Sequence, residues 1–241
     1  MKNLLNFSAL GLLTIFGATA AHADTVASTS VAATANIYGP AGASAPADSP
    51  ATAITVTGGT TITFSSVTGT ISLDSGGHNN DADGIGSAQG SHNDAFGSFS
   101  GITAPNAGYL AGVFVPVGGP TGGAPGDSDF TGAGDTSFTA LAPALDEVFF
   151  IGDGQTGDGG GSTQQFFVPA GAGTLYLGIA DACIYNGPAI GCYDDNSGTF
   201  NINYDLVLGS VTPIPEPSSL ILFGTGILGA FSAVRRRIQT A

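Results

Sequence analysis

The residues best suited to bind a ligand lie close together in the carboxyl-terminal half of the chain. An alternating apolar run ends just before Asp181, and a loop later Asp195 and Asn196 precede another such run. Ca²⁺ takes about six to eight oxygen ligands in flexible geometry, so carboxylate and amide oxygens in one loop predict a calcium site. In an extended loop only one of Asp194 and Asp195 can point into the site, and we assign Asp195. The alternative is that residues 195–198 form a tight turn without an ion.

Cys183 and Cys192 are the two cysteines of the chain and lie between these acidic residues. Two cysteines pair by default in a protein that is exported, as the two ends of this chain, described below, indicate. Closing a loop of about ten residues stabilises the folded state by roughly 2.5 to 3 kcal/mol in the chain-entropy model. We expect this disulfide also to hold Asp181 and Asp195 at a fixed distance. The alternative, a metal–thiolate site, lacks a supporting histidine or cysteine nearby.

A second run of oxygen-bearing residues begins at Asn79. Asn79, Asp81 and Asp83 stand at the first, third and fifth positions of an EF-hand-like loop, with Gly84 at the sixth. The position of the bidentate glutamate is Gly90, so the ligand set is incomplete. We interpret this run as an Asx-rich turn.

Neighbouring carboxylates raise the question of catalysis. Asp146 and Glu147 are adjacent, but neighbours on a strand face opposite sides, and the chain has no tryptophan to form a sugar platform. His78 and His92 lie in Gly/Ser/Asn-rich loops without a recognisable nucleophile motif. The sequence therefore predicts no catalytic residues and no enzymatic activity.

The charge distribution excludes several classes of partner. All four basic residues, Lys2 and Arg235 to Arg237, lie near the two ends of the chain. Of the 18 acidic residues only Glu216 lies in the tail, so the body carries 17 acids and no lysine or arginine. Such a surface cannot neutralise phosphates, so we expect no nucleic-acid partner.

The two ends resemble targeting segments. Residues 1–23 have the features of a secretory signal peptide, with a basic start, an apolar run and Ala21 and Ala23 at the cleavage site for signal peptidase. Residues 218–234 are apolar and uncharged, and at helical rise they reach about 25 Å, a short transmembrane helix. Because basic residues stay in the cytoplasm, Arg235, Arg236 and Arg237 predict a cytoplasmic end and an exported body, residues 24–212.

The triplet Pro215, Glu216, Pro217, followed by Ser-Ser-Leu, the apolar span and the arginines, resembles the PEP-CTERM sorting signal of Gram-negative bacteria. The resemblance covers residues 213–237. It implies that an exosortase recognises the triplet, cleaves nearby and delivers the body to the cell surface or the extracellular polysaccharide. The prolines keep the peptide extended, as a protease requires. The alternative is a simple tail anchor behind a proline-rich linker.

The body is predicted to be all-β. Short β-rich runs are separated by Gly/Asp/Asn clusters, and helical periodicity is missing. We expect strands at 53–57, 60–73, 109–117, 147–152, 164–168, 174–180 and 199–208, with a possible edge strand in 26–38 and a flexible loop at 40–50. This pattern favours an antiparallel β-sandwich of jelly-roll or galactose-binding-like type, flanked by the signal helix and the transmembrane helix.

Residues 166–200 resemble the carboxyl half of calcium-dependent galactophilic lectins of the PA-I type. The resemblance implies that Asp181, a main-chain carbonyl near Cys192, and Asp195 with Asn196 bind Ca²⁺, whose shell is completed by sugar hydroxyls. Asp195 stands where the family has an amide, and the loop is longer. The leading hypothesis is a calcium-stabilised, lectin-like module bound to extracellular polysaccharide. The alternatives are a structural matrix protein without sugar specificity and, more remotely, a secreted hydrolase.

Overall fold

The computed structural model describes residues 25–74, 77, 79–84, 90–157, 159–188 and 191–207. Its helices within these ranges are 3₁₀ segments, η1 (Gly39–Ala41) and η2 (Tyr193–Asp195). No helix in these ranges is long and apolar enough to cross a membrane. The predicted signal peptide with Ala21 and Ala23, and the whole segment 213–237 with its transmembrane helix, lie outside the described residues.

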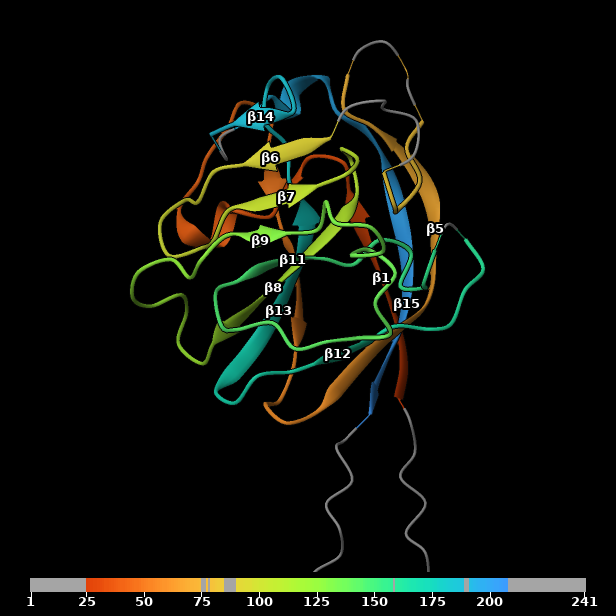
Figure 1. Cartoon of the computed structure of the whole chain (residues 1–241). Coiled ribbons are helices and arrows are strands. Elements are labelled where there is room, and N and C mark those ends of the chain that lie inside the picture. The colour runs from red at the N-terminus through yellow and green to blue at the C-terminus, as the bar shows by residue number, and fades with distance from the viewer. Residues whose placement is uncertain are drawn as a thin grey trace, which may run out of the picture.

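Sheet A contains the longest strands and forms one side of the body (Figure 1). β15 pairs antiparallel with β1 on one side and with β5 on the other, so the first and last described strands are neighbours. The strand order is β1 (Thr25–Ala32), β15 (Ser197–Val207), β5 (Thr61–Ser72), β12 (Gln165–Phe167) and β10 (Ala140–Leu141).

Two further sheets complete the body. Sheet B has the order β11 (Val148–Phe150), β8 (Leu110–Pro116), β13 (Ala172–Ile179), β2 (Ala35–Asn36) and β3 (Ser49–Pro50), and β4 (Thr52–Thr55) also pairs with β13. Sheet C is smaller and has the order β14 (Asn186–Gly187), β6 (Ser91–Asn93), β7 (Ile102–Ala104) and β9 (Ser128–Asp129).

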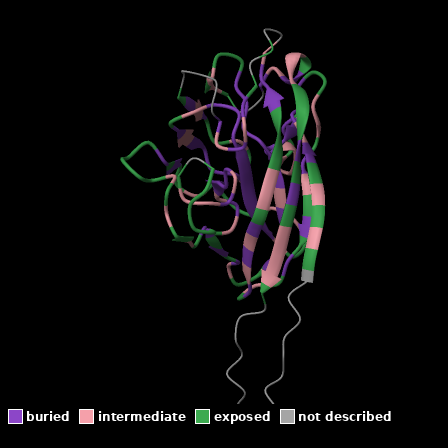
Figure 2. Ribbon diagram, turned by 90° about the vertical axis from the view of Figure 1, so that its right-hand side faces the viewer, coloured by how far each residue is buried: buried purple, intermediate pink, exposed green. Residues whose placement is uncertain are grey.

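Alternation of apolar and polar residues places one face of sheet A in the core. On β15, Phe200 and Ile202 are buried, whereas Asn201 and Asn203 are exposed. The strands of sheet A accordingly show alternating buried and exposed bands (Figure 2). The predicted half-buried final strand is confirmed.

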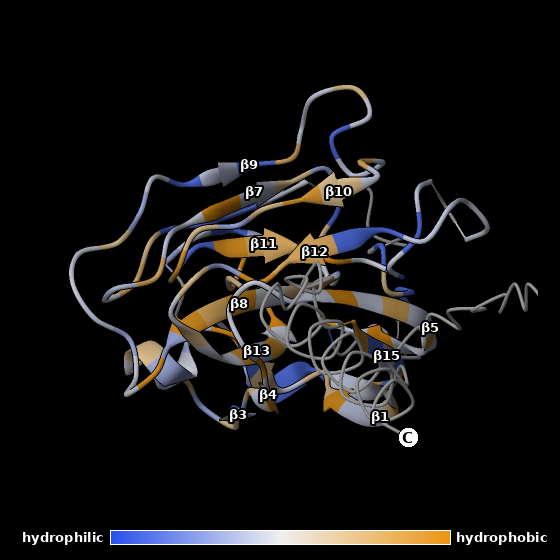
Figure 3. Cartoon of the chain, turned by 90° about the horizontal axis from the view of Figure 1, so that it is seen from below, coloured by the Kyte–Doolittle hydropathy of each residue, from blue (hydrophilic) through white to orange (hydrophobic). Residues whose placement is uncertain are grey.

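An aromatic cluster joins sheets A and B. The ring of Phe166 on β12 lies 5.6 Å from that of Phe149 on β11, and 5.5 Å from that of Phe64 on β5. β11 and β12 are largely hydrophobic (Figure 3). Gly112 on β8 permits this packing, because a Cβ there would lie 2.8 Å from the Phe149 ring. Face-to-face packing of two sheets through one core is the sandwich arrangement that the sequence predicts.

The pairing is more varied than the predicted antiparallel sandwich. The long pairs, β1 with β15, β15 with β5 and β13 with β8, are antiparallel. Several short pairs are parallel, among them β10 with β12, β2 with β3 and β6 with β14. These strands have only two or three residues, and the chain between the two members of each pair is long enough to supply the crossover that parallel pairing needs. The sheets are therefore mixed, and the jelly-roll type stays a prediction.

Candidate functional site

Three of the four predicted ligand residues, Asp181, Asp195 and Asn196, meet at one end of the body, where sheets A and B come together. Asp181 follows β13 of sheet B, and Asn196 precedes β15 of sheet A. The Asn196 amide Nδ2 donates hydrogen bonds to Asp181 Oδ2 at 2.9 Å and to the Ala33 carbonyl at 3.1 Å. Because Ala33 directly follows β1, one amide ties together three segments far apart in the sequence.

Asp181 is a buried carboxyl group, with 3% of its surface exposed. The pKa of Asp181 is raised from 3.8 to about 7, mainly by burial and to a smaller extent by the nearby carboxylate of Asp195, while hydrogen bonds from Asn196 and the Ala182 backbone oppose the shift. Burial therefore favours the protonated form of this carboxyl group at pH values where an exposed aspartate is ionised. A cation beside it would replace that proton.

Two oxygen atoms at this site have no hydrogen-bond partner among the described residues. They are Asp195 Oδ1 and Asn196 Oδ1, and both atoms are shielded from solvent. An unpaired buried acceptor costs about 1 to 3 kcal/mol, so each of these atoms favours a bound donor or cation. The orientation of Asn196 is fixed, since its Nδ2 already donates twice.

A pocket of about 360 Å³ opens beside these residues. It is lined by Asp181 and Asp195, and also by Cys192, whose carbonyl was a predicted ligand. The complete lining is Leu73, Asp74, Asp181, Ala182, Cys183, Ile184, Tyr185, Cys192 and Asp195. Asp74, two residues after the end of β5, was not identified from the sequence.

Tyr193 anchors the loop that carries Asp195, and it too was not identified from the sequence. Its side chain is fully buried, and its hydroxyl lies 2.8 Å from the Ile179 carbonyl and 3.2 Å from Asn36 Oδ1. Asn36 lies 157 residues away along the chain. The loop that carries Asp195 is thus anchored to the end of β13 and to β2.

The predicted disulfide between Cys183 and Cys192 is present, with a Cα–Cα distance of 4.8 Å. We expect the double variant Cys183→Ser/Cys192→Ser to lose roughly 2.5 to 3 kcal/mol of unfolding free energy, because the unfolded chain regains the entropy of the opened loop. Urea unfolding of oxidised wild type and of the variant measures this difference. Reduced wild type should match the variant, and equal stability of all three samples would contradict the prediction.

The donor set at this site suits a hard cation. No group of three or more His, Cys, Asp or Glu side chains in the described ranges is placed to hold a metal ion. A cation here would depend on Asp181, Asp195, the Asn196 amide oxygen and main-chain carbonyls. All of these are oxygen donors, as Ca²⁺ prefers, and two of them are unpaired.

The second predicted run forms a local turn where it is described. Asp81 Oδ1 accepts a hydrogen bond from the Asp83 backbone at 3.1 Å, which is an Asx turn, and Asp83 Oδ1 accepts one from the Asp153 backbone at 3.0 Å. His78 lies outside the described residues.

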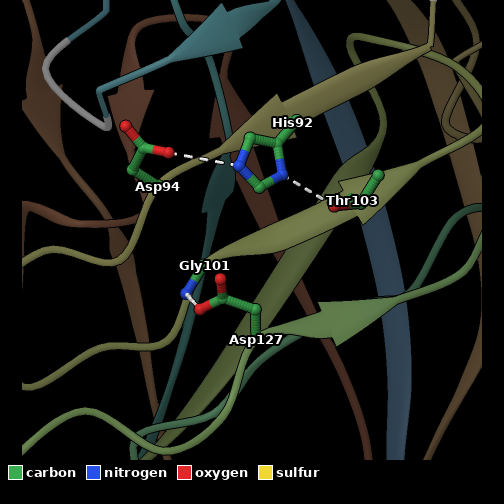
Figure 4. A network of polar contacts seen from close by, with 5 residues as sticks. All are labelled: His92, Asp94, Gly101, Thr103 and Asp127. Atoms are coloured by element: carbon green, nitrogen blue, oxygen red, sulfur yellow. Dashed lines mark hydrogen bonds and ion pairs between the residues drawn. The ribbon is translucent and has the colours of Figure 1, made fainter.

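The candidate catalytic residues make structural contacts. Glu147 accepts hydrogen bonds from Ser128 Oγ at 2.9 Å and from the Ala144 backbone at 2.7 Å. His92 on β6 lies 2.7 Å from Thr103 Oγ1 through Nδ1 and 3.1 Å from Asp94 through Nε2 (Figure 4). The Nδ1 contact links β6 to β7, whereas the Nε2 contact is local to the end of β6, so both ring nitrogens have partners.

Comparison with known proteins identifies the tail. Residues 213–237 match the PEP-CTERM protein-sorting motif, as the sequence predicted. The motif marks an exported chain with a carboxyl-terminal sorting signal, and it implies an exosortase as the processing partner. No curated protein and no solved structure matches the chain.

Proposed function

We propose that this exported, exosortase-sorted protein is a calcium-stabilised carbohydrate-binding module that associates with extracellular polysaccharide. The observation that carries the proposal is the pair of unpaired, buried oxygens, Asp195 Oδ1 and Asn196 Oδ1, beside the buried carboxyl of Asp181. The resemblance of residues 166–200 to calcium-dependent lectins supports the same site. The proposed role is binding, without catalysis.

Each residue has a distinct task in this proposal. Asp181 and Asp195 supply negative charge, and Asn196 supplies a neutral oxygen while its Nδ2 holds the Asp181 carboxylate in place. A bound Ca²⁺ would supply a positive centre for sugar hydroxyls in a body that has no lysine or arginine. The pocket of about 360 Å³ offers room for a sugar ring next to these ligands.

Asp195→Ala is expected to abolish calcium-dependent stabilisation. At a hundredfold excess over Kd, calcium should stabilise the wild type by about 2.7 kcal/mol, which raises Tm by roughly 5 to 10 °C. Melting curves in EDTA and across a calcium titration measure this shift. The control is Asp194→Ala, because Asp194 is the exposed neighbour and does not line the pocket.

The same pair of variants tests sugar binding. Retention of the protein on immobilised exopolysaccharide should require calcium in the wild type and in Asp194→Ala, and should be lost in Asp195→Ala. A calcium response that persists in Asp195→Ala would overturn the site. A calcium response without retention on any glycan would favour the alternative of a structural matrix protein, in which calcium stabilises the fold or cross-links acidic surfaces. Turnover of a polysaccharide substrate would instead favour a secreted hydrolase.

A further inference from the structure

We propose a second ligand site, which binds a neutral sugar without calcium, in a pocket between η1, β3 and β13. The pocket has a volume of about 370 Å³, within the usual range of ligand sites. Among its lining residues, Tyr176 is the aromatic one and Asp48 the acidic one. The complete lining is Gly39, Pro40, Ala43, Ser44, Asp48, Ser49, Pro50, Ala51 and Tyr176, none of which lines the Asp181 pocket.

Tyr176 is placed by the alternation of β13. Leu175 and Leu177 on either side of it point into the core and are fully buried, so the Tyr176 ring lies on the opposite face of sheet B, half-buried. Tyr176 is the aromatic residue of the lining, beside two prolines, Pro40 and Pro50, and several small residues. An aromatic ring presents a flat face of the kind on which the C–H groups of a sugar can pack.

Asp48 is held in place by only one of its oxygens. Oδ2 accepts hydrogen bonds from Asn36 Nδ2 and from the Ala45 backbone, each at 3.0 Å. No described residue donates to Oδ1, which is therefore available to a ligand. Asn36 is itself fully buried and accepts a hydrogen bond from the Tyr38 backbone at 2.9 Å, so the carboxylate is positioned before a ligand arrives.

The backbone on either side of Asp48 is also held in place. Ala47 has a φ of 58°, a left-handed conformation that is unusual for a residue with a Cβ, and it directly precedes Asp48. The Asp48 backbone donates to the Ala45 carbonyl at 3.3 Å, and Ser49 Oγ lies 2.9 Å from Thr34 Oγ1. Such strain persists where surrounding contacts impose it, and it recurs at ligand sites.

Charge decides the class of ligand. Asp48 is the only charged residue in the lining, and the body has no lysine or arginine to bind an anion. A phosphate or uronate would face an uncompensated carboxylate, whereas a sugar hydroxyl can donate a charge-assisted hydrogen bond to Oδ1. The pocket therefore favours neutral sugars over anionic ones. It requires no ion and does not depend on the proposed calcium site.

The test is binding of methyl glucoside and of glucuronate to the purified chain in EDTA, followed by NMR chemical-shift changes. We expect weak binding of the neutral probe, in the millimolar range, with shifts at Tyr176, and at least about tenfold weaker binding of glucuronate. Tyr176→Ala should weaken the neutral probe at least about tenfold, whereas Tyr176→Phe, which keeps the ring, should change it little.

Asp48→Asn is a second variant of the pocket, which tests the proposal even if Tyr176→Ala fails to fold. It can keep both hydrogen bonds made by Oδ2 but removes the negative charge, so discrimination against glucuronate should fall to less than about threefold. Asp205→Asn, on β15 of sheet A and outside the pocket lining, should leave discrimination unchanged. Absence of binding to wild type in EDTA, or equal binding to wild type and Asp48→Asn for both probes, would overturn the inference. Loss of calcium binding in Asp181 or Asp195 variants would leave it intact.

Discussion

In calcium-free buffer, Asp181→Asn is expected to be more stable than the wild type at pH 8 by roughly 3 to 4 kcal/mol, and to lose that advantage at pH 4. The folded-state pKa of Asp181 is raised from 3.8 to about 7 by burial. Between these values the folded protein holds a proton that the unfolded chain has released. Stability therefore falls as pH rises from about 4 to about 7, by about 1.36 kcal/mol for each unit of pKa shift.

The variant isolates this contribution because asparagine has nearly the same shape and does not titrate. Its carbonyl can still accept from Asn196 Nδ2, so the main change is the charge. The measurement is urea unfolding of both proteins in EDTA from pH 4 to pH 8, compared as a difference. The matched control is Asp194→Asn, an exposed carboxylate that should follow the wild-type curve.

Calcium should restore the stability that the wild type loses as the pH rises, since the ion takes the place of the proton at Asp181. Its affinity should rise between about pH 6 and pH 8, as the carboxyl releases its proton. Asp181→Asn should show neither the pH slope nor the calcium response. If the unfolding free energy of Asp181→Asn fell with pH as steeply as that of the wild type, the charge on Asp181 would not be the cause of the fall. If the variant kept the full stabilisation by calcium, the ion would bind at another site.

The longer strands could be predicted from the sequence because each carries a pattern of its own. Phe200 to Leu206 alternate strictly with polar residues, and the burial of β15 follows that pattern from Phe200 to Asn203, where the pairing with β5 shifts in register. The strands of sheet C could not be predicted, because β6, β7, β9 and β14 have only two or three residues, too few to display a period. Contacts from remote loops, rather than local propensity, define them.

The candidate site, too, could be predicted only in part from the sequence. Asp181, Asp195 and Asn196 could be identified because they flank strands that the sequence pattern locates. Their supporting partners could not, since the Ala33 carbonyl is 163 residues from Asn196. Nothing local to Ala33 or Asn36 distinguishes them from other small or polar residues in turns. Their roles depend on the way in which sheets A and B meet.

Phe166→Ala is expected to cause the largest loss of stability of any variant described here, about 3 to 5 kcal/mol. The Phe166 side chain is fully buried, and its ring contacts those of Phe64, Phe138 and Phe149 at centroid distances of 5.5, 5.7 and 5.6 Å. Truncation would leave a cavity between sheets A and B. Thermal unfolding should show a fall in Tm of roughly 6 to 20 °C.

Phe167→Ala is the matched control, because the next residue on the same strand carries the same side chain on the opposite face. Phe167 is 43% exposed, and its truncation should cost less than about 1 kcal/mol. A shift of β12 by one residue against β5 would exchange the environments of the two rings. Equal losses, or the larger loss at Phe167, would therefore refute the register of β12, and with it the aromatic contact that joins the two sheets.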